Sequence, residues 1–344
     1  MLPPLARANE VPYAPLRRAV LAAGLLDRRY GYYVFVSLRC VALYFAALVL
    51  AVLLPASFWS VLLAGVALGF AGSQTALLGH DAAHSAVFRR SGANRLLGMV
   101  CWSLGIGVSY WWWREKHDRH HGHTNDIDRD PDLVGGGIIV FRGEDAVNRT
   151  GLKRLIVRHQ AFLLPALFLI AGLVMRWEST LYAIRKLRDQ RRLVDLALIT
   201  GHLASWLALA AIAGPHVLVI FLVAQLAGGF YFALIVSPNH KGMPVWEGDA
   251  PLGFLARQVL SSRNVAPGLL TDFLFGGLNY QVEHHLFPTM PRINFRRART
   301  IVRAYCRAHG LPYDETGLVQ SYIRLFGAMH RIGRGELAPE WQLA

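Results

Sequence analysis

Six apolar stretches of 18 to 23 residues limit the folds open to this chain. They cover about residues 32–54, 58–79, 95–112, 160–177, 193–213 and 216–236. About 20 helical residues, at ~1.5 Å each, cross the ~30 Å hydrocarbon layer of a bilayer. In a soluble domain of 344 residues, the apolar residues would be dispersed with helix or strand periodicity instead. The sequence therefore predicts an all-α integral membrane protein.

Short turns join two pairs of these stretches. The tripeptide PAS separates the first two and GP separates the last two, so each pair is predicted to form a helical hairpin. The stretches 95–112 and 160–177 are shorter and are interrupted by glycine or proline, and basic segments flank the second one on both sides. We therefore expect both to be re-entrant or interfacial segments. Four transmembrane helices in two hairpins remain.

Positive charge sets the predicted orientation. The formal net charge is +14, and basic residues gather beside the apolar stretches, most densely in RKLRDQRR at 185–192. The positive-inside rule places such loops in the cytoplasm, which puts both termini there too. This pattern argues against nucleic-acid binding. We expect a cytoplasmic segment at 1–31 with a surface helix at 13–29, a main domain at 32–310, and a cytoplasmic tail at 311–344.

Most of the fourteen histidines fall into three clusters with helical spacing. HDAAH ends the second span, HDRHH follows the aromatic run YWWW in a predicted loop, and QVEHH lies after the fourth span. Residues three and four apart share one face of a helix, so each cluster can point at one place. In the four-span topology all three clusters emerge in the cytoplasm and can meet in a histidine-rich cap. The predicted ligands are His80, His84, His117, His120, His121, His284, His285 and, just after the fourth span, His240.

Eight histidines exceed the needs of one metal ion, because a zinc site usually takes four ligands. They suit two octahedral or nearly octahedral ions with open positions. Neutral imidazole binds iron, zinc and copper alike, so the ligand type leaves the metal open. Gln281 is a further candidate for the site. The other histidines are expected to have structural roles: His123, His159, His202, His216, His309 and His330.

These clusters resemble the three histidine boxes of the membrane fatty acid desaturases. HDAAH, HDRHH and QVEHH match HxxxH, HxxHH and QxxHH in that order, and the glutamine resembles the front-end and acyl-lipid branch. The resemblance covers about residues 30–310. It implies a non-haem diiron enzyme that uses O₂ and two electrons to remove two hydrogens from an acyl chain. It also implies that the eight histidines ligate iron, and it leaves the role of Gln281 open.

Removing hydrogen from a methylene requires a strong metal-bound oxidant beside the correct carbon, with no nucleophile or general base. Acidic residues near the boxes are candidates to orient the imidazoles, although caps, turns or solvated charges explain them equally well. They are Asp81, Asp118, Asp128, Asp130, Asp132 and Glu283. Aromatic residues are candidates for the wall of an acyl tunnel, although anchoring at the membrane interface explains the tryptophans equally well. They are Trp111, Trp112, Trp113, Phe273 and Phe275.

The resemblance also bears on partners. Front-end relatives often carry a fused cytochrome b5 domain with the haem motif HPGG, which this sequence lacks, and no nucleotide motif is present. We therefore expect an external donor such as ferredoxin, rubredoxin or free cytochrome b5. The acyl carrier stays open among a lipid, CoA and acyl-carrier protein. One basic helix face can meet an acidic donor, a CoA phosphate or lipid headgroups, or rest on anionic membrane; it carries Arg296, Arg299, Arg303 and Arg307.

Three other kinds of function would explain some of these sequence features. A lipid hydroxylase, epoxygenase, conjugase or carotenoid ketolase would share the boxes, but QxxHH together with LFPTMPR favours desaturation. An intramembrane metalloprotease would need a single zinc and would leave two boxes unexplained. A metal transporter would place its ligands near the bilayer midplane, not at the ends of spans. The high content of alanine, arginine and leucine indicates a GC-rich bacterial genome and hence a bacterial plasma membrane.

Overall fold

The chain divides into two compact units in the computed structural model. The structure describes residues 11–133, 138–186, 188–248 and 252–336, so the outer parts of the predicted terminal segments, 1–10 and 337–344, lie outside it. We call the unit with residues 28–115 and 165–234 the span unit. The other, which we call the histidine unit, contains 1–27, 116–164 and 235–344.

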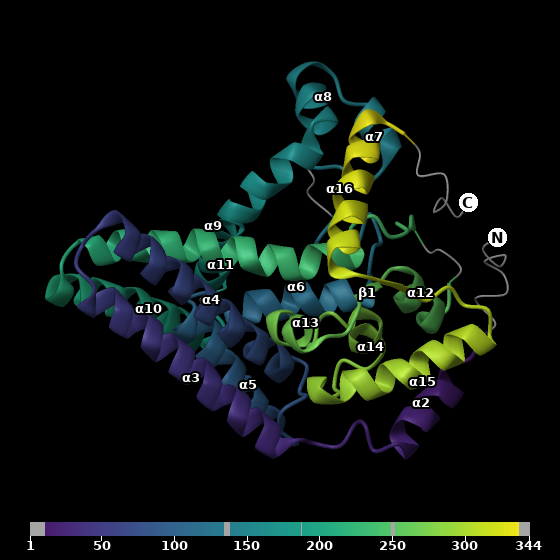
Figure 1. The fold of residues 1–344 in the computed structure, drawn as a ribbon, viewed down its shortest axis with the longest axis horizontal. Helices are drawn as coiled ribbons and strands as arrows, with labels where there is room; N and C mark the ends of the chain where they lie inside the picture. Colours follow the sequence, from purple (N-terminus) through teal and green to yellow (C-terminus); the bar gives the residue numbers. More distant parts are fainter. Residues whose placement is uncertain (1–10, 134–137, 187, 249–251, 337–344) are drawn as a thin grey trace. The chain divides into compact units, whose positions relative to one another are not determined.

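Long apolar helices build the span unit (Figure 1). Of the described residues, five helices are long and apolar enough to cross a membrane. They are α3 (Tyr30–Leu53), α4 (Phe58–Ala83), α9 (Gln160–Arg185), α10 (Gln190–Ala213) and α11 (His216–His240). Four of them, α3, α4, α10 and α11, correspond to the predicted spans. The finding confirms an all-α membrane protein, and α9 adds a fifth candidate.

The prediction that proline and glycine interrupt the stretch 160–177 is wrong. Helix α9 continues through Pro165 and Gly172 to Arg185. Proline removes only one backbone hydrogen bond near the start of this helix. The charged residue Arg176 lies inside α9, where its guanidinium donates to Gln225 and to the carbonyl oxygen of Gly107. Length therefore permits α9 to cross the bilayer.

The stretch 95–112 is interrupted, as predicted. Helix α5 (Ser91–Met99) passes into a π-helical turn, η1 (Val100–Gly105), and α6 (Tyr110–Gly122) begins after a break. Gly107 lies in that break with a φ of +67°, which favours glycine. A Cβ there would also lie 2.5 Å from the ring of His202. A larger residue at position 107 would therefore clash with α10.

Apolar side chains cover the outer surface of α3. Five of them, spaced along its length, are between 59% and 66% exposed: Val34, Phe35, Leu38, Val41 and Phe45. A continuous exposed apolar face of this kind would be a liability in water, but it matches the acyl chains of a bilayer. The surface of α3 therefore agrees with its assignment as a span.

Glycines allow α4, α9 and α11 to pack closely. A Cβ on Gly229 would lie 2.3 Å from the backbone nitrogen of Gly172, and one on Gly69 would lie 2.7 Å from that of Gly228. Small residues at such crossings let membrane helices approach each other. The opposing atoms belong to the backbone, so they cannot rotate away as the end of a side chain could.

We expect Gly229→Ala to destabilise the protein by about 1–3 kcal/mol, because the added methyl forces two helices apart. Thermal unfolding in detergent measures the loss. Gly31→Ala is the matched control, since a Cβ on Gly31 has no heavy atom within 4 Å among the described residues. Equal melting temperatures for the two variants would contradict the close packing.

Short elements and two longer helices, α15 and α16, build the histidine unit. They are α2 (Tyr13–Ala22), α7 (Gly143–Val147), α8 (Gly151–Arg158), α12 (Phe254–Leu260), α13 (Leu269–Leu274), α14 (Gln281–Leu286), η2 (Arg292–Asn294), α15 (Phe295–Ala308) and α16 (Leu318–Arg334). In α15, Ala298, Val302 and Cys306 are spaced four apart and buried. They pack with Leu16 and Val20 of α2, so α2 is docked in this unit and is shorter than the predicted helix 13–29.

One small sheet was not predicted. Strands β1 (Arg263–Val265) and β2 (Asp314–Thr316) pair in parallel, with Arg263 opposite Asp314. Nε of Arg263 donates to Oδ2 of Asp314 at 2.8 Å, and Arg263 is only 3% exposed. The strands are too short to show an alternating pattern in the sequence. They tie the chain after α12 to the segment before α16.

Candidate metal centre

Two histidine boxes and His240 lie in the histidine unit. The second box is in α6, which starts at the aromatic run, so the predicted loop is a helix. It ends at Gly122. The third box forms α14, a single buried helical stretch at Gln281–Leu286, and His240 is the last residue of α11. Helical spacing therefore governs both boxes.

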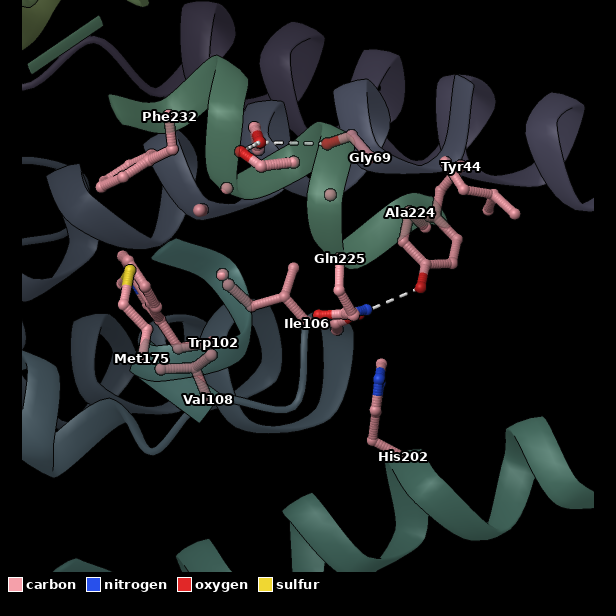
Figure 2. A pocket seen from close by; sticks show the side chains of 18 of the residues that line it. Tyr44, Gly69, Trp102, Ile106, Val108, Met175, His202, Ala224, Gln225 and Phe232 are labelled. Atoms are coloured by element: carbon pink, nitrogen blue, oxygen red, sulfur yellow. Dashed lines mark hydrogen bonds between the residues drawn. The ribbon is translucent and has the colours of Figure 1, made fainter. Parts of the chain in front are cut away.

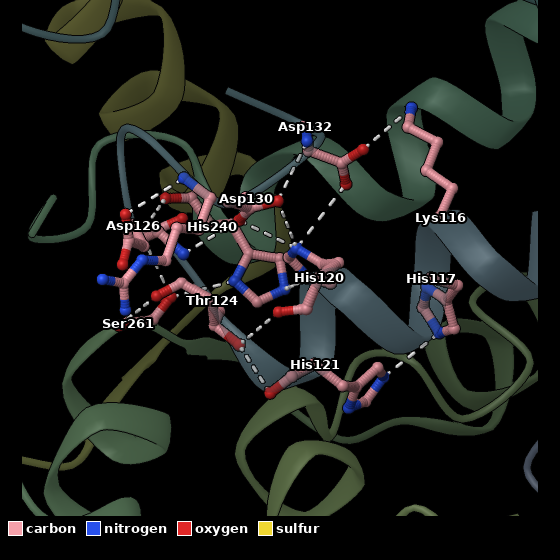
Figure 3. A network of polar contacts seen from close by, with 12 residues as sticks. Lys116, His117, His120, His121, Thr124, Asp126, Asp130, Asp132, His240 and Ser261 are labelled. Atoms are coloured by element: carbon pink, nitrogen blue, oxygen red, sulfur yellow. Dashed lines mark hydrogen bonds and ion pairs between the residues drawn. The ribbon is translucent and has the colours of Figure 1, made fainter. Parts of the chain in front are cut away.

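Three imidazoles from three elements converge: His120 from α6, His240 from α11 and His285 from α14. One ring nitrogen from each lies within 4.8 Å of the others. The three side chains are at most 8% exposed. Figure 3 shows His120 and His240 side by side within a network of polar contacts, with their ring planes nearly perpendicular.

Hydrogen bonds determine which nitrogen of each ring carries the proton. Nδ1 of His120 lies 2.9 Å from a carboxylate oxygen of Asp130, and Nδ1 of His240 lies 2.9 Å from the carbonyl oxygen of Ser261. These oxygens can only accept, so each Nδ1 is the donor. In the neutral rings both Nε2 atoms then present lone pairs, and they lie 3.4 Å apart.

His285 completes this arrangement. Its Nδ1 lies 2.8 Å from Oε1 of Gln258, whose amide nitrogen donates to the carbonyl oxygen of His121, so the amide orientation is defined. No described residue hydrogen-bonds to Nε2 of His285, which is buried. Ring nitrogens that converge with their lone pairs directed at one point suit a cation between them. Two nitrogens at about 2.1 Å from one metal ion are about 3.0–3.4 Å apart, which matches the observed 3.4 Å.

A second group adjoins the first. His121 and His284 join His285 with ring nitrogens within 4.8 Å of one another. Nε2 of His121 also lies 3.1 Å from Nε2 of His117, and the rings of His117 and His284 are stacked with centroids 6.1 Å apart. All six predicted histidines of the histidine unit are thus close together. Their donor set fits two metal ions of the kind that imidazole binds.

Asp130 orients His120. Both of its carboxylate oxygens lie within 3.0 Å of Nδ1 of His120, and it is fully buried. Burial lowers the pKa of His120, but the Asp130 carboxylate outweighs this, so the pKa is raised above its ordinary value. Asp132 lies 3.7 Å from the same nitrogen and pairs with Lys116 at 3.0 Å. A carboxylate that accepts from the far nitrogen makes an imidazole a stronger ligand.

The other acidic candidates differ from one another. Among the described residues, Glu283 accepts hydrogen bonds from Asn264 at 2.7 Å and from Tyr313 at 2.9 Å, and neither partner is a histidine. Burial raises the pKa of Glu283 to about 7. Asp128 is exposed. For Asp118 the orienting role stays a prediction.

Gln281 lies at the centre rather than beside it. Its amide nitrogen is placed 2.7 Å from Nε2 of His240, and its oxygen accepts from Asn239 at 3.1 Å. The amide group is therefore aimed at the same nitrogen that can bind a metal ion. Its role at the centre, as a metal ligand or as a hydrogen-bonding neighbour, stays a prediction.

Residues that the sequence did not single out also hold the centre. Gln258 fixes His285, and the carbonyl of Ser261 fixes His240. Thr124 donates to the carbonyl of His120 and contacts Oε1 of Gln258, both at 3.0 Å. Thr124 follows the second box closely, but nothing in the sequence around Gln258 or Ser261 points to the site.

The first box belongs to the span unit. His80 lies in the last turn of α4 and His84 follows that helix directly, with ring centroids 4.8 Å apart. Oδ1 of Asp81 lies 3.4 Å from Nδ1 of His80, and Tyr33 donates to Oδ2 at 2.9 Å. The ring of Trp113 lies 5.5 Å from that of His80. The pair therefore has its own orienting carboxylate.

Comparison with known proteins agrees with this arrangement. Residues 56–317 match the fatty acid desaturase family, described as "Fatty acid desaturase". The chain belongs to this family. It is 29% identical to the Delta(8)-fatty-acid desaturase of Euglena gracilis over 95% of this chain and 82% of that protein. It is 31% identical to the Delta(8)-fatty-acid desaturase of Helianthus annuus, covering 88% and 68%.

A third relative of this desaturase is the Delta(6)-fatty-acid desaturase fat-3 of Caenorhabditis elegans, 31% identical over 74% of this chain. The aligned part spans 60% of the nematode protein. Family membership and the helices confirm an integral membrane protein that acts as a fatty acid desaturase. The positions of the three boxes, residues 80–84, 117–121 and 281–285, all fall within the matched region.

The basic face of α15 is partly neutralised. Arg299 forms a two-pronged ion pair with Glu315, and Arg303 lies 3.8 Å from the same carboxylate. Arg296 and Arg307 are exposed. This leaves less positive charge on the helix than the sequence predicted, so the choice among a donor protein, a phosphate and the membrane stays open.

Proposed function

We propose that this desaturase inserts a double bond into an acyl chain at a diiron centre. For each double bond, one O₂, two electrons and two protons are consumed, the chain loses two hydrogens, and two waters are released. The observation that carries the proposal is the set of buried imidazole lone pairs that converge from α6, α11 and α14. When bound, the two irons supply the oxidant that breaks unactivated C–H bonds.

We assign eight histidines as the iron ligands. Six are the converging histidines of the histidine unit, and His80 and His84 supply the other two. The spacing of that pair and the Asp81–His80 contact, which repeats the Asp130–His120 contact, support this assignment. The ligands are His80, His84, His117, His120, His121, His240, His284 and His285, with Gln281 as a ligand or hydrogen-bonding neighbour.

The surrounding residues preorganise the ligands. Asp130, Gln258 and the carbonyl of Ser261 hold three rings with Nε2 directed to the centre, so no proton has to leave these nitrogens when iron binds. Burial of His120, His284 and His285 keeps bulk water away, which protects the oxidant from side reactions.

Two iron ions per chain are expected in the purified protein, and prolonged chelation should remove them and abolish activity. Elemental analysis gives the iron content. Because iron binds this ligand set only in the folded protein, the melting temperature should fall on chelation and recover when Fe²⁺ is restored. An unchanged melting temperature after verified iron removal would contradict the fit between the pocket and the metal.

We further propose that both termini and the metal centre face the cytoplasm. The basic segment 185–192 supports this orientation. Five spans would put the termini on opposite sides, whereas four would put them on the same side. Accessibility of single cysteines at each terminus to a membrane-impermeant thiol reagent separates the two topologies. The bacterial plasma membrane stays a prediction, and the relatives named above are eukaryotic.

The substrate and donor follow from the family chemistry. We propose a fatty acyl chain on a lipid, CoA or acyl-carrier protein, and a separate electron donor such as ferredoxin, rubredoxin or cytochrome b5. A desaturase-deficient host that expresses the wild type is the test, with its lipids derivatised to locate new double bonds. A new unsaturated acid supports the proposal. Hydroxy or keto products would instead favour the related hydroxylase or ketolase chemistry.

A further inference from the structure

We propose that the span unit binds the hydroxyl-bearing end of an unbranched lipid chain in a cavity of about 70 Å³. Six elements line it: α3, α4, η1, α9, α10 and α11. The walls are largely glycine and apolar side chains, including Leu68, Ile106, Met175 and Phe232 (Figure 2). None of the proposed iron ligands belongs to it, so this inference does not rest on the proposed function.

His202 is the first reason to expect a polar ligand. It is 4% exposed and lines the cavity, and its side chain extends from α10 toward Gln225 and Tyr44 (Figure 2). Its Nδ1 lies 2.8 Å from the carbonyl oxygen of Leu104, so Nδ1 is the donor and Nε2 the acceptor. No residue in the described part of the chain hydrogen-bonds to that buried Nε2.

Gln225 supplies the complementary donor. Its Oε1 accepts from Nε of Arg176 at 3.2 Å and from Nη2 at 2.7 Å, so the amide orientation is defined. The NH₂ group of Gln225 is therefore the end available to the cavity that it lines. A hydroxyl can donate to His202 and accept from Gln225 at the same time. An ether or a hydrocarbon cannot.

The location of the cavity among candidate membrane helices also supports a polar ligand. Arg176 and His202 lie inside helices assigned as candidate spans, where polar side chains are costly and usually mark a functional site. The cavity is several times the ~10–15 Å³ that one water requires. It is too small for a ring system, so it suits the end of a single chain. The same hydroxyl chemistry can come from a free long-chain alcohol or from an acyl chain hydroxylated at its far end.

Competition binding tests the site on the purified full-length protein in nanodiscs. Tritiated hexadecan-1-ol is displaced by unlabelled hexadecan-1-ol or by its methyl ether, which has the same chain but no hydroxyl donor. We expect the ether to compete about tenfold less well, as the loss of one buried hydrogen bond predicts. His202→Leu should abolish that preference. His216→Leu should retain it, because His216 does not line the cavity.

A second variant guards against misfolding of His202→Leu. A Cβ on Gly72 would meet only Ile106, at 3.4 Å, so Gly72→Leu can fill the cavity and leave His202 in place. It should abolish specific binding of the alcohol. Equal competition by alcohol and ether in the wild type would overturn the proposal and indicate a hydrated cavity, as would alcohol binding that survives Gly72→Leu.

Acyl-CoA competitors distinguish a free long-chain alcohol from an acyl chain hydroxylated at its far end. Stronger competition by 16-hydroxyhexadecanoyl-CoA than by hexadecanoyl-CoA would assign the site to the far end of an acyl chain. Competition by the free alcohol alone would assign it to a separate lipid. The readout is binding, so it is independent of iron content and of turnover.

Discussion

His284→Ala is expected to lower desaturation more than about 100-fold, because removing a ligand should exceed the 10–100-fold cost of losing a residue that only orients one. His284 is 2% exposed, and its ring lies 4.7 Å from that of His121. The iron content should fall below two per chain. Lipid analysis in a desaturase-deficient host and elemental analysis of the purified variant measure the two effects.

His309→Ala is the matched control for this experiment. His309 belongs to the same unit but is exposed, and it stacks on Tyr305 with ring centroids 4.1 Å apart. It should retain wild-type activity and two irons. The ligand assignment fails if His284→Ala, inserted normally into the membrane, still forms the unsaturated product at a rate comparable with that of His309→Ala.

Asp130→Asn should weaken iron binding by about 10–100-fold while preserving the fold. An amide is nearly the same size as the carboxylate, and its oxygen can still accept from Nδ1 of His120. It lacks the negative charge that strengthens the imidazole as a ligand. It also replaces one of the two oxygens that accept from the backbone N–H groups of Asn125 and Asp132, at 2.8 and 2.9 Å. Titration with a competing chelator gives the affinity.

Asp128→Asn separates this effect from a general loss of charge. Asp128 lies in the same acidic turn but is exposed, so its iron affinity should match that of the wild type. If Asp130→Asn binds iron within about twofold of Asp128→Asn, the carboxylate does not tune the centre. Its burial would then reflect only its hydrogen bonds to the backbone.

Motif spacing made the second and third boxes predictable. Both depend on local geometry, since residues three and four apart on α6 and α14 face the same way whatever surrounds them. The loop expected for the second box is a helix, and the polar character of the box had hidden this. Only His120 of the box is buried, whereas His117 and His121 are partly exposed and Asp118 and Arg119 are exposed.

The predicted interruption of 160–177 was wrong because Pro165 and Gly172 do not end α9. Arg176 is accommodated inside this helix because Gln225 and two backbone carbonyls from the break after η1 accept its hydrogen bonds. Those partners lie 49 and about 70 residues away in the chain. The sequence contains Arg176 but not the contacts that allow it to remain inside a membrane helix.

Local spacing thus determined the membrane class, the histidine boxes and the family resemblance, because each depends on residues close together in the chain. Long-range contacts determined how the metal-binding rings are held and, among the described residues, left the buried Nε2 of His202 without a hydrogen bond. Gln258 reaches His285 across 27 residues, Asn125 reaches the carbonyl of Pro244 across 119, and His202 reaches Leu104 across 98. Such pairings form only when distant segments pack together, so no pattern in the sequence contains them.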